Sequence, residues 1–204
     1  MIARATRPLL ITGIVKKHPW TIHPLTADRW SDFETLFGEK GACGGCWCMH
    51  WRLRGKAFDE GKGAKNRQAM KKLVAGGAEP GILAYDGDRP IGWCAVAPRE
   101  QYPRLLNSRS LQPVDDTPVW SIVCFFVSKD YRGKGVTTAL AAEAVQFVKE
   151  HGGKMVEGYP YDYRGKAALP PPFVYTGLIQ AFEKAGFKEV ARPSKTRAIM
   201  RKKT

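Results

Sequence analysis

A short glycine-rich run, RGKGVT at residues 132–137, stands between an apolar stretch and a helical pattern. A helix begins with several backbone amides that have no partner inside the helix, and its dipole adds partial positive charge there. Anions therefore bind readily at helix N-termini, and glycines let the backbone approach phosphate oxygens without a Cβ in the way. Arg132 and Lys134 add formal positive charge. The run therefore predicts a pyrophosphate-binding site.

The spacing of this run excludes two common phosphate-binding motifs. No G-x-x-x-x-G-K-[ST] sequence is present, and the G-x-G-x-x-G spacing of dinucleotide-binding folds also fails. A glycine-rich turn between a strand and a helix can also be merely a tight connection. On spacing alone, both the phosphate-binding and the purely structural interpretation stay open.

The elements around the run are predicted from periodicity. Residues 119–128 (VWSIVCFFVS) are apolar almost throughout, as expected of a strand buried on both faces. Another strand is predicted at 155–161. Between them an apolar residue recurs every four positions, which predicts a helix with one buried face: Val136, Leu140, Ala144 and Val148. The two strands of such a β-α-β unit should run parallel.

The remaining elements predict a mixed sheet flanked by helices, which is an α/β (α+β) fold. The predicted strands lie at 20–25, 82–86, 90–97, 187–192 and 196–201, and the predicted helices at about 26–38, 65–75 and 176–185. With the parallel unit they give a mostly antiparallel sheet of about six to seven strands. Thr26 is expected to cap the first helix, and Gly186 the last, with Phe187 folding back onto Phe182.

Two stretches resemble motifs of the GCN5-related N-acetyltransferase (GNAT) family. The run FFVSKDYRGKGVTTAL resembles its acetyl-CoA-binding motif, [QR]-x-x-G-x-[GA]: Arg132 and Gly135 match the first two fixed positions, and Thr137 replaces Gly or Ala at the third. The run YTGLIQAFEKAGFKEV resembles the family's next motif, a helix that ends in a Gly-Phe pair. The order of elements fits from about residue 20 to residue 201, so the resemblance covers nearly the whole chain.

The resemblance implies an acyl-CoA N-acyltransferase (GNAT) fold and transfer of an acetyl group from acetyl-CoA to an amine by direct attack in a ternary complex. Acetyl-CoA, as co-substrate, would lie in a V-shaped opening between the strands 119–128 and 155–161. Backbone groups near Phe126 and Val127 would pair with the pantetheine arm. The pyrophosphate would be held by one continuous segment: Arg132, Gly133, Lys134, Gly135, Val136, Thr137 and Thr138. A single acetyltransferase domain is expected at 20–204, after a basic extension at 1–19.

The resemblance is incomplete at the catalytic acid. Many family members place a Tyr in the last helix, where this chain has Phe182, and an Asn seven residues earlier, where it has Tyr175. Tyr175 is therefore the candidate acid, and packing beneath the proline-rich loop is the alternative. Glu100 is the candidate base, because it follows a strand expected to border the substrate cleft. The alternative is an exposed loop carboxylate.

The cysteine-rich run CGGCWCMH at residues 43–50 has three interpretations. Cys43, Cys46 and His50 suit a zinc half-site, but cysteines from distant strands would have to complete it. Cys43 and Cys46 also have the spacing of a redox pair. We favour a loop that walls the acceptor pocket, without metal, and expect three of its residues to bind substrate: Trp47, His50 and Trp51. In the alternative interpretation the two Trp side chains fill the core.

The stretch 162–175, interrupted by three consecutive prolines, is a second candidate pocket wall. Tyr159, Tyr161 and Tyr163 recur at period two, so they would share one face if the preceding strand continues. Such a face would either line a substrate channel or pack within the sheet.

The formal net charge is +14, from 33 Lys and Arg against 19 Asp and Glu. Such a surface attracts phosphate on a nucleotide, a nucleic acid or a membrane, or is simply solvated. The rival function is a nucleic-acid- or ribosome-associated binding module on the same fold, with exposed Trp and Tyr side chains that stack on bases. We favour the enzyme, with a small-molecule or protein amine as acceptor. The family resemblance also allows a homodimer.

Five cysteines, an odd number, suit a reducing cytosol better than a disulfide framework. No apolar stretch approaches the roughly 20 residues that span a bilayer. A cytoplasmic protein without a membrane partner is therefore expected.

Overall fold

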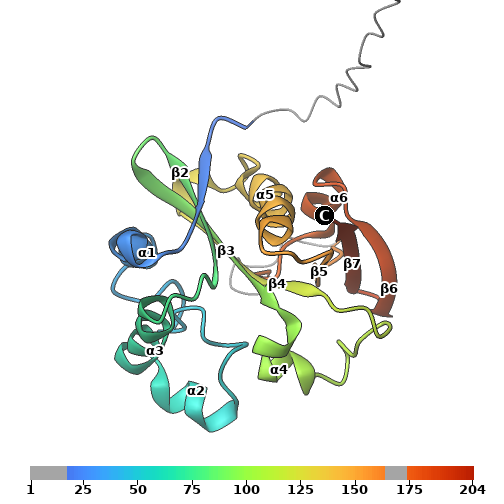
Figure 1. Cartoon of the computed structure of the whole chain (residues 1–204), viewed down its shortest axis with the longest axis horizontal. Helices are drawn as coiled ribbons and strands as arrows, with labels where there is room; N and C mark the ends of the chain where they lie inside the picture. Colours follow the sequence, from blue (N-terminus) through green and yellow to red (C-terminus); the bar gives the residue numbers. More distant parts are fainter. Residues whose placement is uncertain (1–17, 164–173) are drawn as a thin grey trace, which may run out of the picture.

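The computed structural model describes residues 18–163 and 174–204. Its centre is a seven-stranded sheet with the order β1-β2-β3-β4-β5-β7-β6 (Figure 1). The strands are β1 (Thr21–Pro24), β2 (Gly81–Asp86), β3 (Arg89–Pro98), β4 (Trp120–Val127), β5 (Met155–Gly158), β6 (Lys188–Ser194) and β7 (Arg197–Lys203). The pairing of β4 with β5 is parallel, and the other pairings between these strands are antiparallel. The mixed, mostly antiparallel sheet is thus confirmed.

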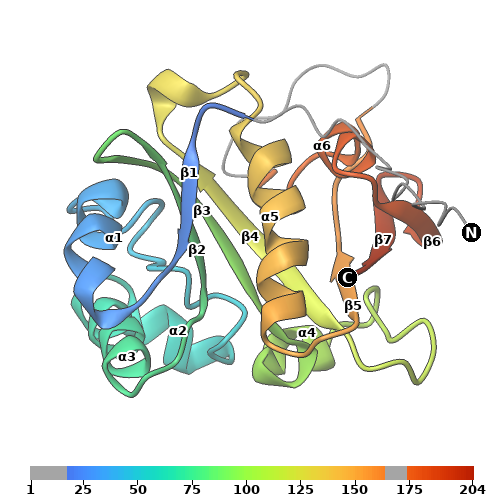
Figure 2. The ribbon, with the colours of Figure 1, turned by 45° about the horizontal axis from the view of Figure 1, so that its top comes forward.

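Helices cover both faces of this sheet. They are α1 (Trp30–Phe37), α2 (Gly55–Gly61), α3 (Ala64–Ala75), α4 (Pro103–Leu106), α5 (Val136–Glu150) and α6 (Ile179–Lys184). Figure 2 shows α5 lying along the sheet, with α1, α2 and α3 grouped together away from it. Within β2, Ile82 and Ala84 pack in the cluster of α5, whereas Leu83 and Tyr85 pack in the cluster of α1. Because successive strand residues face opposite sides, the sheet carries a core on each face.

The first helix has the predicted buried face but a different start. Trp30, Phe33 and Phe37 are all buried. The prediction that Thr26 caps the first α-helix is wrong, because a 3-10 turn at Ala27–Arg29 lies between Thr26 and α1. That turn brings a carboxylate within reach, and the Thr26 hydroxyl donates to Asp28 Oδ1 at 2.6 Å instead of accepting from a helical amide.

The predicted end of the last helix is confirmed. Gly186 has φ +85°, a left-handed conformation in which glycine lacks the Cβ clash of other residues. The Phe187 amide donates to the Phe182 carbonyl oxygen at 3.0 Å. Their ring centroids lie 5.0 Å apart, so the apolar contact expected of this cap is present.

Three segments differ from the sequence prediction. The helices α2 and α4 were not predicted, and β5 ends at Gly158 rather than 161. Tyr161 forms only isolated bridges, to Leu178 and to Arg197. Tyr159, the first residue after the strand, is fully buried, whereas Tyr161 and Tyr163 are half-buried. The three tyrosines of this stretch therefore do not share one strand face.

A buried ion network holds β5 between its neighbours. The carboxylate of Glu157, fully buried in β5, accepts from Arg99 Nη1 at 3.1 Å, from the Tyr159 hydroxyl at 2.7 Å and from Arg201 Nε at 2.7 Å. The Ser121 hydroxyl lies 2.8 Å from the same phenol. Buried charges are stable only when paired and hydrogen-bonded in this way. The network fixes β5 to β4 at the end where the two strands are paired.

No helix in the described ranges is long and apolar enough to cross a bilayer.

Candidate active site

The parallel strands β4 and β5 diverge halfway along β4. They pair at Trp120, Ser121 and Ile122, and β5 then ends, whereas β4 continues to Val127. Beyond the divergence, the Phe125 amide donates to the Tyr175 carbonyl oxygen at 2.6 Å. This is the V-shaped opening that the family resemblance implies, narrowed on one side by the chain around Tyr175.

A cavity of about 780 Å³ occupies this opening. One end is formed by the turn before α5, from Tyr131 to Thr138. The middle is formed by the last part of β4, residues 124–127, opposite Gln180, Ala181 and Lys184 of α6. The other end is formed by the cysteine-rich loop and Tyr175. The predicted phosphate turn and the predicted acceptor wall therefore open onto one continuous space.

The amides that begin α5 have no acceptor. Among the described residues, no hydrogen bond is donated by the backbone amides of Gly133, Gly135, Val136, Thr137 or Thr138. No side chain caps the helix, and Gly135 occupies the N-cap position. These N–H groups and the positive end of a helix of 15 residues meet at the cavity wall. Such an arrangement is complementary to a phosphate.

The two glycines leave this wall open. Gly133 has φ +75° and Gly135 has φ +91°, and a Cβ added to either would meet no atom within 4 Å. No protein atom among the described residues therefore occupies the space where these two Cβ atoms would lie. Arg132 is exposed and donates from Nε to the Val127 carbonyl oxygen at 3.1 Å. Lys134 does not line the cavity, and its Nζ lies 5.0 Å from the ring centroid of Tyr131.

Backbone groups of β4 face the same space. The Ser128 amide donates to Ile91 of β3, and successive strand residues direct their backbone groups to alternate sides. The Val127 amide therefore points away from β3, toward the cavity that Val127 lines. This refines the predicted pair of Phe126 and Val127, because the amide of Phe126 points toward β3.

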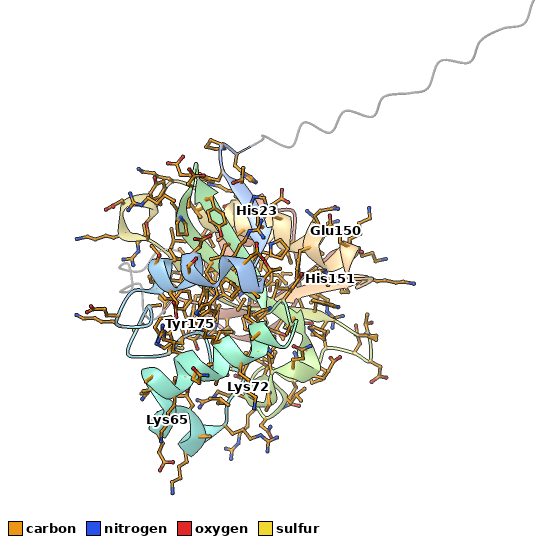
Figure 3. All side chains as sticks on the ribbon, turned by 60° about the vertical axis from the view of Figure 1, so that its left-hand side comes forward. His23, Lys65, Lys72, Glu150, His151 and Tyr175 are labelled. Atoms are coloured by element: carbon orange, nitrogen blue, oxygen red, sulfur yellow. The ribbon has the colours of Figure 1, made fainter. Side chains whose placement is uncertain are left out.

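Tyr175 presents a phenol to the cavity. Its hydroxyl has no hydrogen-bond partner in the described part of the chain, and burial raises the pKa of Tyr175 to about 12. The phenol therefore carries its proton at neutral pH. Tyr175 is half-buried, whereas Lys65 and Lys72 of α3, which are labelled with it in Figure 3, are exposed. Phe182, which stands where many family members have the acid, is fully buried and does not line the cavity.

The cysteine-rich loop reaches the cavity through most of its predicted residues. His50 and Trp51 line it, but Trp47 does not. Trp47 is buried and stacks on Phe37 with ring centroids 5.8 Å apart. Trp47 therefore fills the core, as the alternative interpretation predicted, whereas His50 and Trp51 line the cavity.

Cysteines from two distant segments meet at this loop. Cys43, Cys46 and Cys48 line the cavity beside Cys124 of β4. Hydrogen bonds from the Cys124 thiol and from Trp93 Nε1, the latter at 3.1 Å, lower the pKa of Cys48. Among the described residues, no group of three or more His, Cys, Asp or Glu side chains is arranged to hold a metal ion.

Glu100 lies away from this site. It is exposed and does not line the cavity. Glu100 is therefore an exposed carboxylate in a connection between elements, which is the alternative interpretation of the sequence. It follows a strand, β3, but it lies in the 3-10 turn at Arg99–Gln101, which leads into α4.

Aromatic side chains are not available on the surface as a base-stacking platform. All Trp and Tyr residues lie in the described ranges, and each is buried or half-buried. The expectation of exposed Trp and Tyr was wrong, because these rings pack in the two cores and around the cavity.

Sequence reasoning did not assign several of the cavity residues to the site, among them Phe58, Cys124, Tyr131 and Lys184. Lys184 had a usable signal, because it lies four residues after Gln180 on the predicted last helix and so shares its face. Cys124 and Phe58 had none, because only the packing of the cysteine-rich loop against β4 brings them to the cavity.

Comparisons with known proteins agree with this geometry. A sequence model of the acetyltransferase (GNAT) family matches residues 47–159, more than half of the chain. No curated protein matches the chain significantly.

Several solved structures share the fold at low identity. AAC(6')-Ib in complex with paromomycin and acetyl-CoA is 16% identical, with a TM-score of 0.53, over 91% of this chain and 94% of that chain. PaiA N-acetyltransferase from Thermoplasma acidophilum in complex with coenzyme A is 14% identical, with a TM-score of 0.50, over 91% and 99%. The NatC complex bound to Gag peptide and CoA is 12% identical, with a TM-score of 0.50, over 92% and 99%. The matched family model shows the family, and the divergent β4–β5 pair and the open turn before α5 agree with it. The chain therefore belongs to the acetyltransferase (GNAT) family.

Proposed function

We propose that the protein transfers an acetyl group from acetyl-CoA to an amine. The observation that carries the proposal is the row of unpartnered amides at the start of α5, which opens onto a cavity that continues along β4 to Tyr175. A pyrophosphate at one end and a slender thioester arm along the strand match these two parts. The aromatic end of the cavity is left for the acceptor.

Each part of the cavity has a proposed binding role. Amides from Gly133 to Thr138 bind the pyrophosphate, with Arg132 adding positive charge. Lys184 of α6 faces the same cavity and adds a second cation. The Val127 amide bonds the amide-containing pantetheine arm in the manner of an added strand. This places the thioester beside Cys124 and Tyr175.

The reaction requires the protein to align the amine with the thioester and to supply one proton to the leaving thiolate. The amine nitrogen forms a bond to the acetyl carbonyl carbon while the carbon–sulfur bond breaks. The Tyr175 phenol, protonated because burial raises its pKa to about 12, donates its proton to the leaving thiolate. The proton lost by the amine then restores the phenol through water in the cavity, so the phenol ends as it began.

The solved structures of similar fold support acetyl-CoA as the co-substrate, but they do not identify the acceptor amine. Those described above contain CoA or acetyl-CoA, but their acceptors range from paromomycin to a Gag peptide. The acceptor must therefore be argued from this chain's own cavity.

Calorimetric titration with acetyl-CoA, followed by mass spectrometry of products from a panel of amines, tests the proposal. We expect saturable acetyl-CoA binding and formation of an N-acetylated product with one equivalent of free CoA. A protein that binds no acetyl-CoA, or that acetylates no amine, contradicts the proposed function.

A further inference from the structure

The acceptor end of the cavity is built from four rings. His50 lies at their centre, with ring centroids 5.3 Å from Trp51, 5.2 Å from Phe58 and 6.0 Å from Tyr175. The interplanar angles are 86°, 87° and 75°, so each neighbouring ring stands nearly perpendicular to the imidazole. Edge-to-face packing of this kind is the favourable geometry for aromatic groups. An inserted aromatic ring would find faces and edges in several directions.

No carboxylate lines any part of this cavity. All 19 Asp and Glu residues lie within the described ranges, since residues 1–17 and 164–173 contain none, so the whole chain offers no such group there. Among residues 18–163 and 174–204, the formally charged lining residues are Arg132 and Lys184. A substrate ammonium in this cavity would thus lose water without gaining a counter-ion, which is costly.

The surroundings of His50 are also positive. Burial first, and then the charge of Arg104, lower the pKa of His50 to about 4, with Lys62 acting in the same direction. Asp59 acts oppositely, but it is exposed and bonds Lys62 at 2.8 Å. The imidazole is therefore neutral at pH 7. A cation placed beside it would meet the same two obstacles, which are the loss of water on burial and the positive charge of Arg104.

Aromatic rings can replace a carboxylate by binding an ammonium over their faces. Here the chain's own cations already use that capacity at Phe58, because Lys62 Nζ and Arg104 Cζ each lie 5.4 Å from its ring centroid. The Phe58 side of the ring cluster is thus electrostatically unfavourable for a further cation.

We infer that the acceptor is a weakly basic amine carried directly on an aromatic ring, which is uncharged at neutral pH. The inference rests on the proposed function and specifies its substrate class. Its ring would occupy the space among His50, Trp51 and Phe58, and its nitrogen would point toward Cys124 and Tyr175. The nitrogen attacks as the free amine, so the site needs no strong base to remove an ammonium proton before attack.

Two acceptors of similar size separate this class from its alternative: 4-ethylaniline, neutral at pH 7, and 4-methylbenzylamine, which is a cation. Product formation is followed by mass spectrometry under saturating acetyl-CoA. We expect kcat/KM at least tenfold higher for the aniline at pH 7. We also expect it to stay level from pH 6.5 to pH 8.5, whereas the benzylamine value rises about tenfold per pH unit, as its neutral fraction does.

A variant that introduces a negative charge tests the same point within one protein. His50→Glu puts a carboxylate at the centre of the ring cluster, and we expect the aniline-to-benzylamine ratio to fall at least tenfold. Acetyl-CoA affinity, measured by calorimetry, should stay within twofold of the wild type, because the phosphate turn is distant along β4. That measurement also confirms that the variant is folded.

The outcomes distinguish this inference from the proposed function. Preference for the benzylamine at pH 7, with acetyl-CoA binding and turnover intact, overturns the arylamine assignment alone. If neither amine is acetylated, binding of 4-ethylaniline to the complex with CoA decides it, and absence of binding overturns it. Failure to bind acetyl-CoA at all removes the proposed function itself, and with it the arylamine inference.

Discussion

The backbone of Tyr175 completes β4: its carbonyl oxygen accepts from the Phe125 amide at 2.6 Å, at a level that β5 does not reach. This contact keeps the Tyr175 ring at the cavity wall, beside His50 and Trp51. Because only backbone atoms make the hydrogen bond, changes to the side chain should leave it in place. The phenol can therefore be tested without dismantling the wall.

Replacing the phenol should affect chemistry rather than binding. Tyr175→Phe removes the proposed acid, so we expect the single-turnover rate to fall about 10²-fold while the acetyl-CoA Kd stays unchanged. Tyr161→Phe is the matched control, since Tyr161 is also half-buried but does not line the cavity. Equal rates for the two variants would remove Tyr175 from the mechanism.

The raised pKa of Tyr175 predicts how the rate depends on pH. Burial raises the pKa of Tyr175 to about 12, and an acid acts in its protonated form. The wild-type rate should therefore show no decline from loss of this proton between pH 7 and about pH 10. A basic limb centred near pH 8 or 9, absent from Tyr175→Phe, would show that the phenol has an ordinary or lowered pKa.

The phosphate turn can be tested with a pair of glycine variants. Gly135→Val and Gly87→Val both place a side chain at positive φ, +91° and +56°, with no protein atom within 4 Å of the added Cβ. Each should cost about 1–2 kcal/mol of folding free energy through strain. Only the Gly135 variant projects into the proposed pyrophosphate site. Calorimetry should therefore show acetyl-CoA affinity reduced at least tenfold in that variant alone, and unchanged affinity there would exclude this site.

The buried imidazole links stability to pH. His50 has a pKa of about 4 when folded, because of burial and the charge of Arg104, and about 6.5 when unfolded. Between these values the unfolded chain binds more protons, so His50 makes the unfolding free energy rise with pH. The contribution is complete above the unfolded pKa and is lost as pH falls toward 4.

His50→Gln removes this titration and leaves the other groups in place. Urea unfolding at intervals from pH 4 to pH 7 should give a flatter dependence for the variant than for the wild type. Identical slopes would mean that His50 titrates normally in the folded protein.

The ion network at β5 should be essential for stability. Glu157 is fully buried and bonds both Arg99 and Arg201. Glu157→Gln leaves the buried Arg99 guanidinium without a counter-charge and Arg201 paired with Asp115 alone, so we expect a loss of about 3 kcal/mol in unfolding free energy. Glu60→Gln removes an exposed carboxylate paired with Lys56 at 3.6 Å and should have far less effect. Similar losses in the two variants, measured by denaturant unfolding, would contradict a stabilising role for the network.

Local patterns predicted the elements around the phosphate turn well. Residues 119–128 are apolar almost throughout because β4 is central and covered on both faces, and the four-residue repeat of α5 follows from its single buried face. Gly135 adopts a positive φ, and Gly186 ends the last helix as expected. Each of these depends on residues close in sequence, so periodicity and glycine placement were sufficient to identify them.

Residues whose roles depend on distant contacts were predicted less well. Trp47 and Trp51 are four residues apart and chemically alike, but one stacks on Phe37 in the core and the other lines the cavity. Glu100 follows the expected strand, but a 3-10 turn leads it away. No local signal separates these outcomes, because each depends on how a loop packs against another element.

The sequence by itself determined the order of elements, the glycine-rich turn before α5 and the family to which these belong, because such features arise from the periodicity and backbone freedom of neighbouring residues. Only the tertiary structure decided which side chains share the acceptor end. The rings of His50 and Phe58 come from one segment and that of Tyr175 from another, more than a hundred residues later in the chain, and no carboxylate lines the cavity where they meet. Those segments meet because the cysteine-rich loop packs against β4 where β5 ends.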